Sequence, residues 1–139
     1  MASFIYNSFI RDVLTGAIDM DTDTFKVMLT TSAYTENKDT HTKRADVTNE
    51  VTGTGYTAGG AATTVTVAAV DTANDDVEIT IGAASWSTST ITARKAVIYK
   101  SRGGASSADE LVAVIDFASD VISTAGTFTL TASTIKFQN

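Results

Sequence analysis

Two stretches of the sequence decide the fold: Ile-Thr-Ala-Arg-Lys-Ala-Val-Ile-Tyr at residues 91–99 and Leu-Val-Ala-Val-Ile-Asp-Phe-Ala at residues 111–118. Each has the length of a strand and is rich in the β-branched and aromatic residues that favour strands. Residues 100–110 between them are rich in Ser and Gly, which predicts an exposed connection. The two stretches therefore predict an antiparallel hairpin. Because both faces of each strand are apolar, we expect the hairpin to lie centrally in a sheet that is covered on both sides.

Length and composition narrow the class of protein. The 139 residues fit one domain, 1–139, and the absence of Cys excludes disulfides, thiolate metal sites and cysteine nucleophiles. A net charge of −6 argues against binding to nucleic acid or to an anionic membrane. The sequence lacks a signal peptide and any apolar run near the roughly 20 residues of a membrane span. We therefore expect no membrane partner, and a protein made or assembled in a cytoplasmic environment.

The first 16 residues predict a helical arm. Apolar residues recur in pairs at helical intervals, with Ser3 as the expected N-cap and Gly16 as the stop. Ile5, Phe9 and Val13 would form the buried stripe. Such a helix would cover an end or edge of the sheets. The alternative is an arm that docks on a neighbouring subunit.

Three carboxylates, Asp19, Asp21 and Asp23, stand at alternate positions and suggest a calcium loop. The pattern fails the EF-hand test, because Thr24 stands where Gly is needed and Thr30 where a bidentate Glu is needed. We expect a solvated turn or edge. A weak divalent-cation site is the alternative, and no cofactor is expected.

Alternation of apolar and polar residues indicates further strands, and residues 43–51 suggest a short helical turn. The segments 62–70 and 77–81, separated by a polar turn, predict a second hairpin with one solvated face. Together the patterns predict an all-β fold: a mostly antiparallel, jelly-roll-like two-layer β-sandwich of seven or eight strands with a short N-terminal helix. The additional strands are expected at residues 25–31, 62–70, 77–81, 127–131 and 135–137.

Several residues invite a chemical role. Gly53-x-Gly55-x-x-Ala58 matches a degenerate dinucleotide fingerprint, but strand-like Thr and Val follow it where a helix is required. Tyr56 in this loop is expected to anchor it by packing its ring. The single His41 lacks a nucleophile or further metal ligands, which favours a surface or hydrogen-bonding role. Trp86 is interpreted as a core plug or strand-end cover, with a sugar platform as the alternative.

No pair of nucleophile and base stands out, so we expect no enzymatic activity and no catalytic residues. Glu110 and Asp116 are the only imaginable acid pair. Asp116 lies in the middle of an apolar strand, where a hydrogen-bonded or edge-facing carboxylate is the simpler interpretation.

A set of short motifs spans nearly the whole chain. The motifs are Phe-Ile-Tyr-Asn-Ser-Phe at 4–9, Asp-Thr-Asp-Thr-Phe-Lys-Val-Met-Leu at 21–29, Ala-Tyr-Thr at 33–35, Asn-Lys-Asp-Thr-His at 37–41, Glu-Val-x-Gly-Thr-Gly-Tyr-Thr-Ala-Gly-Gly at 50–60, Ala-Arg-Lys-Ala-Val-Ile-Tyr at 93–99, Asp-Phe at 116–117 and Gly-Thr-Phe at 126–128. Together they resemble a family of small virion proteins of tailed bacteriophages. The resemblance implies a structural component, which we place among head decoration or cement proteins, and it carries no catalytic residues.

Two functions follow as hypotheses. The first is a capsid decoration protein that stabilises the assembled head, located in the virion, binding the major capsid protein or another virion protein, and forming a homo-oligomer with a trimer favoured. The second is a tail or fibre component that binds a host-surface glycan or protein, chiefly through Trp86 and Tyr56. Contacts are expected from the N-terminal helix and from loops 32–42, 52–60 and 101–110. The candidate contact residues are Phe4, Phe9, Tyr34, His41, Tyr56, Trp86 and Arg102.

Overall fold

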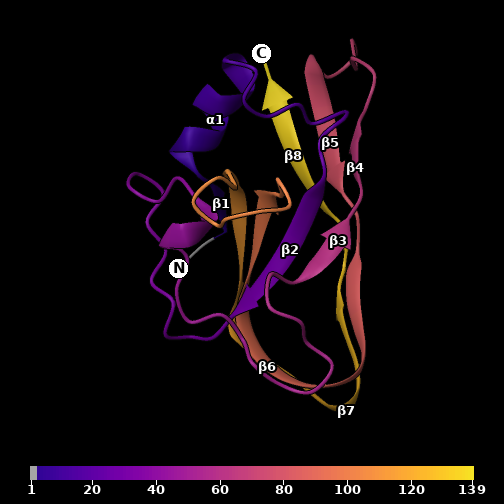
Figure 1. Cartoon of the computed structure of the whole chain (residues 1–139). Coiled ribbons are helices and arrows are strands. Elements are labelled where there is room, and N and C mark those ends of the chain that lie inside the picture. The colour runs from indigo at the N-terminus through magenta and orange to yellow at the C-terminus, as the bar shows by residue number, and fades with distance from the viewer. Residues whose placement is uncertain (1–2) are drawn as a thin grey trace.

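The computed structural model of the chain describes residues 3–139, which form two antiparallel sheets and one short α-helix (Figure 1). Strands make up 49% and helix 8% of the described residues, which confirms the expected β-sandwich class with eight strands. The larger sheet has the order β1-β7-β6-β2-β3 and the smaller has the order β4-β5-β8. The elements are β1 (Phe4–Ile5), α1 (Asn7–Leu14), β2 (Phe25–Thr30), a 3-10 turn (Arg44–Asp46), β3 (Ala61–Thr63), β4 (Val65–Val67), β5 (Asp76–Ile81), β6 (Ala84–Lys100), β7 (Leu111–Leu130) and β8 (Ser133–Gln138).

The predicted central hairpin is confirmed as the pairing of β6 with β7, in which Ile98 lies opposite Ala113. Both strands are longer than the sequence predicts. β7 joins the expected strands 111–118 and 127–131 into one. Bulges make this continuity possible: Ala118 and Ala125 adopt positive φ, and the register shifts several times along the pair. In Figure 1 the two strands curve together round the bottom of the view.

The hairpin is buried on both faces, as predicted. Its inner face contributes Ile98 and Ala113 to the main core between the two sheets. Its outer face contributes to a second, smaller cluster, which is covered by Tyr34 from the segment after β2 and by Val47 directly after the 3-10 turn. That cluster consists of Tyr6, Met28, Tyr34, Val97, Tyr99, Leu111 and Val114, with Phe4 and Val47 packed against it.

The N-terminal helix is shorter than predicted and begins at Asn7. Phe4 and Ile5 pair with β7 as the strand β1, and the Ser3 hydroxyl accepts a hydrogen bond from the Asp116 N–H (3.0 Å) instead of capping a helix. The reason is that an extended backbone lets this aromatic and β-branched pair complete the sheet edge. Gly16 does end the helical segment, with a φ of 77°. The first two residues of the predicted arm, 1 and 2, lie outside the described residues.

The strand predicted at residues 62–70 is divided between the two sheets. β3 pairs with β2, whereas β4 pairs with β5 as the predicted second hairpin. The division falls at Thr64, whose carbonyl accepts a hydrogen bond from the Gly82 N–H (2.7 Å). A Cβ at Gly82 would lie 2.3 Å from the Thr64 hydroxyl, so only glycine allows this crossing.

The glycine-rich loop 52–60 lies against β2 and β6. Gly60 has a φ of 78°, and a Cβ there would lie 1.8 Å from the Val27 carbonyl oxygen. Tyr56 anchors the loop as predicted, since its hydroxyl accepts a hydrogen bond from the Leu29 N–H (3.0 Å) and donates one to Glu50 (2.7 Å). The glycines therefore serve close backbone approach to the sheet rather than phosphate binding.

We predict that Gly60→Ala lowers the free energy of unfolding by more than about 3 kcal/mol, because the new methyl group collides with the backbone of β2. Gly103→Ala is the matched control: its φ is also positive (76°), but nothing lies within 4 Å of its Cβ position. It should cost only about 1 kcal/mol. Urea unfolding of both variants checks this, and equal losses would contradict the close-approach argument.

Candidate functional site

An apolar groove runs between α1 and the inner face of the smaller sheet. Figure 1 shows β5 and β8 reaching beyond β2 toward α1, so the larger sheet does not cover this end. The hollow beside α1 has a volume of about 690 Å³, and a second of about 260 Å³ adjoins it at Phe137. We call the two together the α1 groove. Its lining residues are Ile10, Val13, Leu14, Gly16, Ile18, Asp19, Met20, Asp21, Val67, Val70, Asp75, Asp76, Val77, Ile79, Phe137 and Asn139.

The α1 groove concentrates the exposed apolar side chains of the protein. Leu14 is 81% exposed and Val70 is 70% exposed, with Ile10, Val67 and Phe137 between 37% and 43%. Within residues 3–139, seven large hydrophobic side chains are exposed, and the five named above line the groove. The exposed apolar side chains are therefore gathered at one place rather than scattered over the surface.

The helix sequence explains why α1 exposes apolar residues. Phe9 is fully buried and Val13 half-buried against the main core. Their neighbours Ile10 and Leu14 are rotated by about 100° on the helix and project toward the groove instead. The Phe9 and Phe137 rings lie 6.3 Å apart, which holds α1 against β8.

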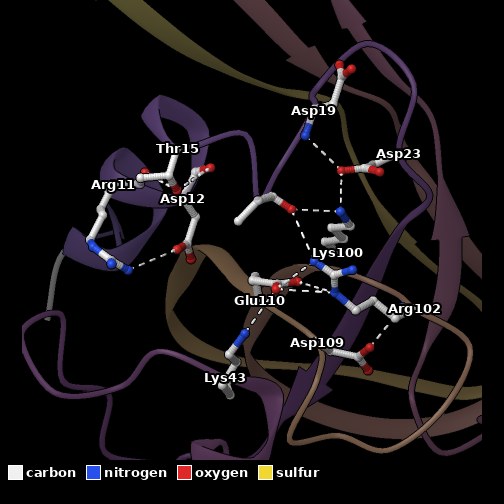
Figure 2. A network of polar contacts seen from close by, with 11 residues as sticks. Arg11, Asp12, Thr15, Asp19, Asp23, Lys43, Lys100, Arg102, Asp109 and Glu110 are labelled. Carbon is white, nitrogen blue, oxygen red and sulfur yellow. Dashed lines mark hydrogen bonds and ion pairs between the residues drawn. The ribbon is translucent and has the colours of Figure 1, made fainter.

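A network of ion pairs lies beside the groove (Figure 2). Glu110, only 4% exposed, accepts hydrogen bonds from the Lys43 ammonium (2.9 Å) and the Arg102 guanidinium (2.9 Å). Asp109 is 1% exposed and accepts a hydrogen bond from Arg44 (2.7 Å). The prediction of an exposed connection at residues 100–110 is therefore wrong for its last two residues, Asp109 and Glu110. These two residues are buried because their carboxylates have cationic partners.

The same network holds the loop that forms one wall of the groove. The Ala17 carbonyl accepts hydrogen bonds from the ammonium of Lys100 (2.7 Å) and from Arg102 (3.2 Å). Lys100 also pairs with Asp23 (2.7 Å), whose carboxylate accepts a hydrogen bond from the Asp19 N–H (2.7 Å). Figure 2 shows these groups converging between the loop and the strand ends. The wall is therefore fixed by polar contacts to its backbone.

Two carboxylates of the network have opposite pKa shifts. Burial alone would raise the pKa of Glu110, but the hydrogen bonds from Arg102 and Lys43 outweigh it and bring the pKa to about 2. Burial raises the pKa of Asp12, against the attraction of Lys43. Its burial is consistent with this direction, since Asp12 is only 9% exposed.

The three aspartates of the candidate cation site form a turn, as one of the two interpretations predicted. The Asp19 carboxylate accepts a hydrogen bond from the Asp21 N–H (3.0 Å), and this contact lowers the pKa of Asp19. Asp23 is paired with Lys100. Within residues 3–139, no group of three or more His, Cys, Asp or Glu side chains is placed to hold a metal ion. The arrangement therefore lends no support to the cation alternative.

A second polar cluster is buried under the segment between β2 and the 3-10 turn. Lys95 donates hydrogen bonds to the Tyr34 carbonyl (2.6 Å) and to Glu36 (2.5 Å). The Tyr34 hydroxyl is hydrogen-bonded to the Tyr6 hydroxyl (3.0 Å) and to His41 Nδ1 (2.9 Å). His41 thus has the predicted hydrogen-bonding role. Burial raises the pKa of Tyr34, so its hydroxyl keeps its proton.

The predicted contact residues are mostly occupied within the chain. Phe9, Tyr34 and Trp86 are buried within the chain, because their large rings pack into its two apolar cores. Trp86 lies between the Tyr56 and Phe128 rings (5.9 and 5.8 Å), so it is a core plug. Phe4, His41 and Tyr56 are half-buried, and Arg102 is exposed but engaged with Glu110. None of these seven residues lines the α1 groove as described.

Glu110 and Asp116, considered together as an acid pair, have separate partners. The Asp116 carboxylate accepts a hydrogen bond from the Ala118 N–H (2.8 Å) and lies 3.5 Å from the Arg94 guanidinium. Burial would raise its pKa, but the hydrogen bond from the Ala118 N–H and nearby positive charge, including Lys95, outweigh this effect and lower the pKa. Both carboxylates are therefore ionised at neutral pH, and neither is a ready proton donor.

Comparison with protein-family models, with curated proteins and with solved structures gave no match. No helix within residues 3–139 is long and apolar enough to cross a membrane. The candidate site therefore rests on the geometry of this chain alone.

We predict that Glu110→Gln lowers stability by about 2 kcal/mol at pH 7. Because the pKa of Glu110 is lowered on folding, its carboxylate stabilises the fold above about pH 4.3, its unfolded value, and this contribution disappears as pH falls toward 2. The stability difference between wild type and variant should shrink over the same range. Urea unfolding between pH 7 and pH 2.5 checks this, with Glu78→Gln as a control whose carboxylate is more exposed. A difference that is independent of pH would contradict the assignment.

Proposed function

We propose that this chain is a non-enzymatic structural protein of a bacteriophage virion, a capsid decoration or cement protein that binds and stabilises the assembled head. The observation that carries the proposal is the α1 groove, in which five exposed apolar side chains form one surface. Small-molecule sites place a few converging polar groups in an apolar pocket, whereas a broad apolar surface suits contact with another protein. The motif resemblance to small virion proteins supports the setting, with the major capsid protein or another virion protein as the partner.

Magnitudes favour an assembly of many weak contacts. Full burial of a Leu or Phe side chain stabilises by about 1.5–3 kcal/mol. Against this, association costs an estimated 4–15 kcal/mol. One groove therefore binds weakly, whereas several copies joined in a homo-oligomer, with a trimer favoured, would bind with high avidity. A protein that binds only the assembled shell stabilises it by mass action.

A preorganised surface loses less entropy on binding, and contacts within the chain hold the α1 groove in place before a partner binds. The groove wall is held through the Ala17 carbonyl by Lys100 and Arg102, and α1 is held by the contact of Phe9 with Phe137. Neither interaction uses the exposed faces of Leu14 or Ile10. Leu14 and Ile10 can therefore be changed without breaking these contacts, whereas Phe137 both lines the groove and holds α1.

We predict that the purified protein sediments saturably with tail-free heads of the phage that encodes it and raises their disruption temperature. Leu14→Glu should weaken binding about tenfold or more, because a carboxylate at this 81%-exposed position would be buried in the contact. Ile122→Glu is the matched control, since Ile122 is 66% exposed but lies outside the groove on β7. Co-sedimentation and heating of the heads with each protein provide the measurement.

Isolated tails are the second arm of this experiment. Binding to tails alone would overturn the decoration proposal and favour a tail or fibre component that binds a host-surface glycan or protein. Binding to neither particle would overturn both.

A further inference from the structure

We propose that the α1 groove receives an apolar segment of another protein that carries Lys or Arg beside its apolar residues. This inference rests on the proposed function and names the chemistry of the partner at the same surface. It follows from two observations, the apolar floor of the groove and the sign of the charges along its rim.

The floor of the groove is apolar on both sides. On one side stand Ile10 and Leu14 of α1, and on the other stand Val67 and Phe137 of the smaller sheet. A hollow of about 690 Å³ has room for several aliphatic side chains, and the adjoining hollow of about 260 Å³ extends it past Phe137. An amphipathic segment placed here would insert its apolar face between α1 and the sheet.

The charged residues that line the groove are all acidic. Asp19 and Asp21 line one end of the groove and Asp75 and Asp76 the other, and no Lys or Arg is among the lining residues that the structure describes. Asp76 is paired with Lys136 (3.3 Å), whereas Asp21 and Asp75 are exposed. The whole chain adds a net charge of −6. The potential at the groove therefore favours a cationic partner.

The same charges argue against two other occupants. In a symmetric contact between two copies, the acidic rims of both grooves would approach each other, which opposes association. An anionic membrane surface would be repelled for the same reason. A basic, apolar protein segment is the occupant that satisfies both the floor and the rim.

The test uses three synthetic peptides as probes: an amphipathic Leu/Lys helix, the same helix with Glu in place of Lys, and a scrambled Leu/Lys sequence of identical composition. Binding is measured by calorimetry, and the contact surface is mapped by amide chemical-shift changes. We expect saturable binding of the amphipathic Leu/Lys peptide alone, with the shifts confined to the segments that line the groove, namely α1, residues 16–21, β4, residues 70–76, β5 and β8.

Two pairs of variants separate the floor from the rim. Leu14→Glu should weaken binding of the Leu/Lys peptide about tenfold, and Ile122→Glu should leave it unchanged. Asp21→Lys should weaken it about fivefold at low salt, with a smaller effect at high salt. Asp120→Lys is the charge-matched control, because Asp120 lies on β7 outside the groove. Melting temperatures verify that each variant is folded.

Equal binding of the three peptides, binding unaffected by Asp21→Lys, or shifts outside the groove would overturn the inference. So would a dimer that Leu14→Glu dissociates, because the occupant would then be a second copy. Failure here is distinguishable from failure of the proposed function. If wild type and Leu14→Glu sediment equally with heads, the groove assignment fails and the decoration function stands. If wild type does not sediment with heads, the function fails whatever the peptides do.

Discussion

The pairing of β6 with β7 is the interaction on which the other layers of this protein depend. Near its closed end the hairpin is apolar on both faces, so it needs cover from both sides. The smaller sheet provides that cover on the inner face, where Ile98 joins the main core. The segment held by Tyr34 provides it on the outer face, where Val97 lies. Positive φ at Ala118 and Ala125 then lets β7 bend and continue instead of ending.

The groove arises from a mismatch in length between the two layers. Residues of the smaller sheet that lie opposite the hairpin, such as Ile81, are buried, whereas Val67 and Phe137 lie farther along the same face and are not fully covered. α1 covers part of the remaining face with Phe9, but a two-turn helix is too short to cover all of it. The apolar surface of Leu14 is thus a consequence of where the layers end.

The sequence predicts the elements whose residues follow a clear local pattern. Runs rich in β-branched and aromatic residues predicted the central hairpin, alternation predicted the second hairpin, and Gly16 marked the end of the helix. The sequence could not predict that β7 would continue through Ala118, because a positive φ at a non-glycine residue is imposed by tertiary packing. Nor could it predict the groove. The adjacent apolar residues of the helix indicated a wide stripe, but which of them is exposed depends on how far the smaller sheet extends.

The wall of the groove shows why contact chemistry and fold stability are separable in this chain. Its position depends on the Ala17 backbone carbonyl, which Lys100 and Arg102 both reach. Glu110 fixes Arg102, and its low pKa keeps it charged throughout the neutral range. None of these side chains lines the groove, so they position its wall without forming part of the contact surface. The apolar floor and acidic rim can therefore match a partner while the buried ion pairs preserve the shape that the partner meets.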